Sequence, residues 1–229
     1  MTTFTLRPLA IGTLALLAFT GNGMSQTPAP ILNTFEVQKL VASSEPADNA
    51  KLSAHFTALA ERYTAEAARH AVMAQSYGGN PNHSTGGSMS VHCKRLAELD
   101  AQSAATLRQL ASHHDSLAAG IASAVPAGGS RFQGGAGASE PTEAGLKALA
   151  ARAVIPADHR ALQEYFLTAA RRYTADAKEH VAIAQSYRGT RIAQAADYCD
   201  RLVANARAAA KEATAAAEMH AQLATIAPR

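Results

Sequence analysis

The chain has 229 residues, of which 48% are hydrophobic but only 5% aromatic, and its formal net charge is +3. Alanine makes up the difference between the two fractions, and because alanine is the strongest helix former, the composition favours helices with thin cores. Basic residues alternate with acidic ones, which excludes the continuous basic surface of a nucleic-acid-binding protein.

The first 25 residues have the pattern of an export signal. Arg7 provides the positive start, an apolar stretch follows from Leu9 to Phe19, and the small residues Gly23 and Ser25 suit a cleavage site after position 25. The apolar stretch is too short to cross a bilayer. We therefore expect a mature chain that is periplasmic or secreted, with no membrane span after cleavage.

The remaining chain divides into two similar units, each with a long helical pattern that begins at a proline. The expected parts are an N-terminal segment (26–45), a first unit (46–124), a linker rich in Gly, Pro and Ser (125–145) and a second unit (146–229). Asp48 and Asp158 suit the N-cap or first turn of the leading helices, which should end near Tyr77 and Tyr187.

A turn-forming cluster at 78–88 should separate the leading helix of the first unit from its second helix. The expected second helices run from about Ser90 to Ala122 and from about Gln194 to Thr225. Short helical stretches are expected ahead of the two leading helices, at Thr34–Ala42 and Glu143–Val154.

The two units are copies of one sequence, over residues 46–118 and 156–224. The matched positions are Phe56, Tyr63, His70, Gln75, Ser76, Tyr77, Cys93, Arg95, Leu96 and His114 with Phe166, Tyr173, His180, Gln185, Ser186, Tyr187, Cys199, Arg201, Leu202 and His220. A repeated helical unit with one apolar face must bury that face against its copy. The sequence therefore predicts an all-α fold, an antiparallel four-helix bundle made of two tandem αα-hairpin repeats.

The apolar face of each leading helix carries an unusual series of polar residues. Glu66 precedes His70 by four residues, as Asp176 precedes His180, so that each carboxylate can reach its imidazole. A carboxylate behind an imidazole is the usual support of a metal-bound histidine. We therefore assign Glu66 and Asp176 to the second shell of a candidate metal site.

Two imidazoles and two thiols should lie at similar distances from the hairpin loops, which would bring them to one layer at that end of the bundle. These candidate ligands are His70, His180, Cys93 and Cys199. Two imidazoles and two thiols suit Zn or Cu. Haem is less favoured as the ligand because no Cys-x-x-Cys-His motif occurs. A secondary candidate cluster is expected at the other end, formed by His55, His114, His159 and His220.

The alternative is a structural or interaction bundle without a ligand, stapled by a Cys93–Cys199 disulfide. Exported proteins often pair their cysteines, and closing a loop of about 100 residues would add about 4–5 kcal/mol in the chain-entropy model. The second helices would be diagonal in an up-down-up-down bundle, whereas bridged Cα atoms must lie within about 7 Å.

Arg62 and Arg172 are expected to cover the surface or to pair with acids.

No Ser/His/Asp set, phosphate loop or metalloprotease helix is present, so we do not expect an enzyme. A protein partner or a homo-oligomer is compatible with either reading.

The pattern Tyr-Thr-x-acid-Ala-x-x-His-x-x-x-Ala-Gln-Ser-Tyr, followed by Cys-x-Arg-Leu, occurs in both copies. It resembles a motif of uncharacterised alanine-rich exported bacterial helical proteins. The resemblance covers both hairpins and carries over no functional residue. Ferritin-like di-iron bundles differ, because their Glu-x-x-His spacing is absent.

Overall fold

The computed structural model describes residues 31–43, 45–79, 83–119 and 142–226. The expected export signal at 1–25 and most of the expected linker at 125–145 lie outside these ranges. Within them the chain forms six α-helices and no strand, which confirms the all-α prediction.

The two leading helices have the predicted limits. Helix α2 spans Pro46–Gly78 and α5 spans Pro156–Arg188, and each has 33 residues. A proline suits the first position of a helix, where its missing N–H would have no partner in any case, and an aspartate in the first turn interacts favourably with the helix dipole. The two leading helices therefore begin in the same way.

The remaining helices differ from the prediction in small ways. They are α1 (Thr34–Ser43), α3 (His83–Ala119), α4 (Glu143–Arg152) and α6 (Ala195–Thr225). Helix α3 begins inside the predicted turn cluster at 78–88, whereas α4 begins at Glu143, as predicted, and ends two residues earlier than predicted. Each glycine costs a helix only about 1 kcal/mol, so packing of the rest of the helix can override that local preference.

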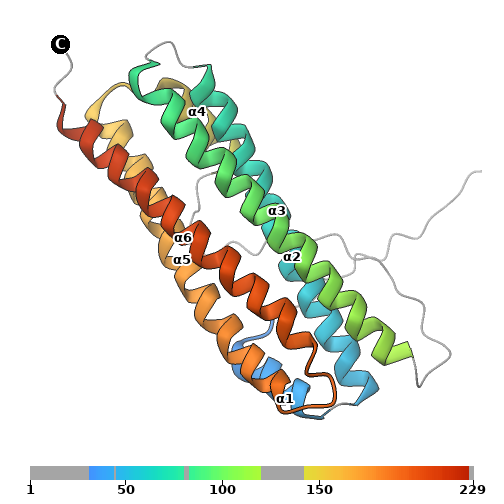
Figure 1. Ribbon diagram of the computed structural model, residues 1–229. Helices are drawn as coiled ribbons and strands as arrows, with labels where there is room; N and C mark the ends of the chain where they lie inside the picture. The colour runs from blue at the N-terminus through green and yellow to red at the C-terminus, as the bar shows by residue number, and fades with distance from the viewer. Residues whose placement is uncertain (1–30, 44, 80–82, 120–141, 227–229) are drawn as a thin grey trace, which may run out of the picture.

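The four long helices lie side by side, and the two hairpins run in opposite directions. The loop between α2 and α3 is at the upper end in Figure 1, and the loop between α5 and α6 is at the lower end. Contacts between α2 and α5 agree: Tyr63 meets Asp176, whereas His70, further along α2, meets the earlier Tyr165. Helices α2 and α5 are therefore antiparallel.

Helices α3 and α6 are neighbours rather than the diagonal pair that we expected. Arg201 of α6 donates to Gln109 of α3 at 3.1 Å, and His92 of α3 lies 2.8 Å from Glu212 of α6. The buried face of α6 includes a series of alanines, which lets the backbones approach closely: Ala206, Ala209, Ala213 and Ala216. Helix α3 ends at the end of the molecule opposite to the start of α5 (Figure 1).

The two short helices lie over the side formed by α2 and α5. Helix α1 contacts both α2 and α5 and buries Val37 and Val41, and α4 also contacts both and buries Leu146 and Ala150. The long core side chains, such as Phe56, are buried between the four long helices. Each buried side chain of this size stabilises the fold by roughly 1.5–3 kcal/mol.

Candidate functional site: a buried polar network

The four predicted metal ligands do not form one layer, and that prediction is wrong. His70 and His180 are both buried, but His70 faces Tyr165 of α5. The stretch of α5 from Tyr165 to His180 spans about 22 Å at the rise of an α-helix. The prediction placed both hairpin loops at the same end of the bundle, whereas the antiparallel arrangement puts matched residues at opposite ends.

The predicted Cys93–Cys199 disulfide is absent for the same reason. Both thiols are buried and unbonded. The α3–α6 contacts place Cys93, beside His92, level with Glu212, and place Cys199 near the level of Gln109. This corresponds to a separation of about 24 Å along the helices, far beyond the reach of a disulfide. Burial raises the pKa of each thiol to about 12, which keeps both protonated and poorly reactive.

Both ring nitrogens of His70 have a partner, one on α3 and one on α5. Its Nδ1 lies 2.8 Å from Asp100 Oδ2, and the Tyr165 hydroxyl lies 3.3 Å from its Nε2. The Asp100 carboxylate also accepts from the Tyr173 hydroxyl at 2.8 Å. Burial raises the pKa of Asp100, and the hydrogen bonds from His70 and Tyr173 oppose that rise. The imidazole is thus held between a carboxylate and a phenol in the centre of the protein.

The expected pairing of Glu66 with His70 and of Asp176 with His180 gives way to pairing with arginine. Glu66 Oε1 accepts from Arg172 at 3.0 Å and from Arg69 at 3.1 Å. Asp176 Oδ2 accepts from Arg62 at 3.0 Å and from the Tyr63 hydroxyl at 2.7 Å. Two of these ion pairs join α2 to α5, which confirms that Arg62 and Arg172 pair with acids.

The secondary histidine cluster is divided between the two ends of the molecule. At one end, His159 Nδ1 lies 3.1 Å from His220 Nδ1, and the Tyr77 hydroxyl lies 2.9 Å from His220 Nε2. The His220 ring stacks on Phe166 with the ring centroids 5.7 Å apart.

The opposite end repeats this arrangement with the matched residues. His114 Nδ1 lies 2.8 Å from Asn49 Oδ1 and so carries the proton, and His114 Nε2 lies 2.6 Å from the Tyr187 hydroxyl. The neighbouring ring of Phe56 lies between His114 and His55. Burial lowers the pKa of His114 to about 4 and that of His220 to about 3, so both are neutral near pH 7.

His180 differs from its counterpart His70, because its Nδ1 is buried without a hydrogen-bond partner. The position that matches Asp100 is Ala206, and the position that matches Tyr165 is His55, whose Nε2 is also buried and unpartnered. A small cavity of about 30 Å³ lies here, and its wall includes both imidazoles, Asp176 and the first residues of the N-terminal segment. Burial lowers the pKa of each imidazole to about 4.

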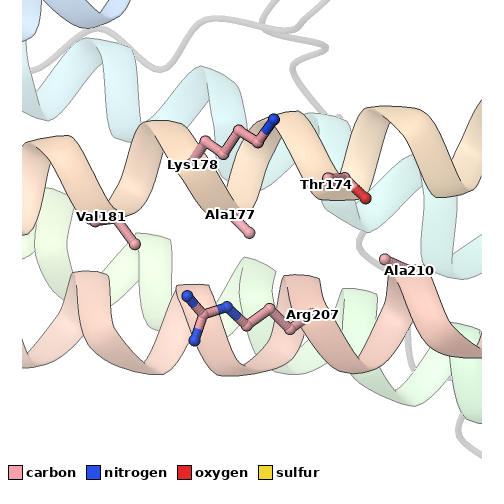
Figure 2. Close-up of a pocket in the computed structure, with 6 residues that line it drawn as sticks. All are labelled: Thr174, Ala177, Lys178, Val181, Arg207 and Ala210. Carbon is pink, nitrogen blue, oxygen red and sulfur yellow. The ribbon is translucent and has the colours of Figure 1, made fainter.

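No three metal-binding side chains converge anywhere in the part of the chain that the structure describes. A larger space of about 470 Å³ lies between α5 and α6 (Figure 2) and is lined by Thr174, Ala177, Lys178, Val181, Arg207 and Ala210. It is an open surface groove whose two cations extend into solvent, and it lies apart from the buried network. None of the described helices is both long and apolar enough to cross a bilayer.

Two hydrogen-bond partners of the buried histidines were not predicted from the sequence. The first is Asp100, the partner of His70; the available signal was an aspartate on the buried face of α3. The Leu32 backbone N–H, which donates to His55 Nδ1 at 3.0 Å, carries no side-chain signal at all.

Comparison with known proteins gives no further assignment: no family model, curated protein or solved structure matches the chain.

Proposed function

We propose that this protein is an exported structural or interaction protein, an antiparallel four-helix bundle of two tandem αα-hairpin repeats whose buried polar network fixes how the hairpins pair. The observation that carries the proposal is that the buried acids and most of the buried imidazoles have partners inside the protein. Tyr63 and Arg62 reach Asp176, Arg172 reaches Glu66, and Asp100 joins His70.

Several of these hydrogen bonds support the proposal because they join one sequence copy to the other. Tyr77 of the first copy meets His220 of the second, and Tyr187 of the second meets His114 of the first. Matched residues thus make matched contacts, as expected for two copies related by a twofold axis across the helices. Hydrogen bonds of this kind are directional, so a slip of either hairpin would leave buried polar groups unpaired, at about 1–3 kcal/mol each.

The same contacts weaken the case for a metal ion or haem as the partner of these side chains. The reason to expect one was that buried acids and imidazoles need compensation. Arginine and tyrosine supply most of that compensation, and His70, His180, Cys93 and Cys199 are distributed along the length of the helices. A protein partner or a second copy bound at the outer surface then becomes the favoured interaction, and we propose no catalytic role.

The leader-like sequence at 1–25 supports a periplasmic or secreted location. Cell fractionation that compares the full chain with a chain lacking these residues tests this point. Export should require the leader, and equal export of both chains would contradict it.

Titration of the chain without residues 1–25 tests the choice between scaffold and metal protein. We expect neither Zn(II), Cu(II) nor haem to bind stoichiometrically in calorimetry, and we expect none of them to raise the melting temperature. Stoichiometric binding with a raised melting temperature would overturn the proposal.

A double-mutant cycle of Tyr63→Phe and Asp176→Asn tests the structural role directly. Because the two side chains share one buried hydrogen bond, their effects on the free energy of unfolding should be coupled by about 0.5–3 kcal/mol. A second cycle, of Tyr173→Phe and Asp100→Asn, tests the hydrogen bond made by the tyrosine that matches Tyr63. Additive effects in both cycles would contradict a role of the network in fixing the pairing.

A further inference from the structure

The N-terminal segment, residues 31–43, is attached to the helices through an imidazole. The Leu32 backbone N–H donates to His55 Nδ1 at 3.0 Å. Further along the segment, Gln38 Nε2 donates to the Ala182 carbonyl oxygen at 3.4 Å, and Val37 and Val41 are buried. Asn33 and Glu36 bond each other's backbone N–H at the start of α1, so this short helix has its own capping box.

The hydrogen bond from Leu32 fixes the tautomer of the neutral His55 ring. A backbone N–H can only donate, so Nδ1 must present its lone pair, and the proton of the neutral ring is on Nε2. His55 Nε2 is buried without a hydrogen-bond partner, and both His55 and His180 line the small cavity; His180 is only 4% exposed, and its Nδ1 is also unpartnered. A second proton on His55 would have to enter at Nδ1, opposite the Leu32 N–H.

We propose that residues 31–43 are an acid-released clasp, in which protonation of His55 breaks the hydrogen bond from Leu32 and frees this segment from α2 and α5. Two N–H groups cannot share a hydrogen bond, so the protonated ring and the docked segment exclude each other. His180 lies in the same cavity, and its charged form would disfavour a positive charge on His55 while the segment is docked.

The charged groups around the cavity affect the pH at which His55 and His180 take up a proton. Arg62 of α2 disfavours a second positive charge on either ring, Asp176 of α5 favours one on His180, and Glu179 of α5 lies at the wall. The wall residues from the N-terminal segment carry no titratable group: Ile31, Leu32, Thr34 and Val37.

The size of the pH effect on release follows from the difference in the pKa of His55 between the docked and the released state. The pKa of His55 is lowered from 6.5 to about 4 in the docked state, and release would return it towards 6.5. The released state therefore gains protons as the pH falls. For this one group, the ratio of released to docked segment should rise by about 100-fold between pH 7 and pH 4.

A spin label on α1 tests the proposal in the chain without residues 1–25. Phe35 is 73% exposed, and the native thiols are buried, so Phe35→Cys gives a single accessible labelling site. On acidification from pH 7, we expect the label to become mobile while the far-UV circular dichroism of the long helices is unchanged. A label that stays immobile until the helices unfold would overturn the proposal.

His55→Gln in the labelled chain is the decisive variant. The glutamine carbonyl oxygen can accept from Leu32 at any pH and does not titrate, so the label should stay immobile at the pH that releases the parent. His92→Gln, on α3 away from the cavity, should release like the parent. Release of the His55→Gln chain at the parental pH would contradict the proposal.

If His55→Gln does not fold, nitrogen NMR of the parent replaces it. The His55 ring should titrate over the pH range in which the label is released, and Nδ1 should gain the proton. Titration of His55 outside that range would exclude it as the trigger.

Discussion

The single residue with the largest expected effect on this network is Asp100. Its carboxylate is the meeting point of His70 from α2 and Tyr173 from α5, and all three side chains are buried. The matched position in the other copy is Ala206, so His180 lacks the corresponding partner. One difference between the two copies thus separates a satisfied imidazole from an unsatisfied one.

Asp100→Ala should destabilise the protein by about 3–5 kcal/mol, because it leaves His70 Nδ1 and the Tyr173 hydroxyl buried without a partner. Urea unfolding followed by circular dichroism measures the change. Asp115→Ala, on the exposed face of the same helix, should change stability by less than about 0.5 kcal/mol. Similar losses for the two variants would show that Asp100 has no special role.

At the scale of the helix, α6 is distinguished by small buried residues. Alanine side chains at this face let α6 approach α3 closely, while α2 and α5 are joined through the longer side chains of arginine and tyrosine. The two sides of the molecule are therefore held by different means, close backbone packing on one side and polar bridges on the other.

Ala213→Leu should destabilise the protein by about 1–3 kcal/mol, because residue 213 is fully buried and the added carbons must displace α3. Thermal unfolding measures the loss. Ala204→Leu lies on the exposed face of the same helix and should be nearly neutral, since leucine and alanine both favour helices. An Ala213→Leu protein as stable as the parent would argue against tight α3–α6 packing.

At the scale of the whole molecule, the buried imidazoles link stability to pH. The pKa values of His55, His114 and His180 are lowered to about 4, and that of His220 to about 3, all by burial. The unfolded chain therefore binds protons at a higher pH than the folded chain does. Each group contributes stability that is present above pH 6.5 and is lost as the pH falls towards 4.

The free energy of unfolding should therefore be constant above about pH 7 and fall steadily between pH 6.5 and pH 4. A shift of one pKa unit corresponds to about 1.4 kcal/mol, so by pH 4 each imidazole should cost the folded state roughly 3 kcal/mol. Asp100, whose pKa burial raises, offsets part of the loss. Urea unfolding at a series of pH values measures the slope, and His114→Gln should reduce it. A flat profile from pH 7 to pH 4.5 would contradict this account.

Much of the local structure could be predicted because its causes are local. Pro46 and Pro156 start the leading helices, the repeated apolar spacing places Tyr63, His70 and their matches inside, and alanine favours helix throughout. The repeat also shows in the surroundings of His114 and His220, since each contacts a tyrosine, a phenylalanine and residue 49 or 159, although the two were expected in one cluster.

The direction in which the second hairpin runs was decided only by the tertiary structure. Two identical faces can bury the same apolar area with their loops at one end or at opposite ends, so the repeat pattern alone does not distinguish the two packings. The contacts that do distinguish them join residues more than a hundred positions apart, such as Arg62 with Asp176 and Tyr77 with His220. Because the loops lie at opposite ends, His70 meets Asp100 and Tyr165, and His180 meets the N-terminal segment instead of a second ligand set.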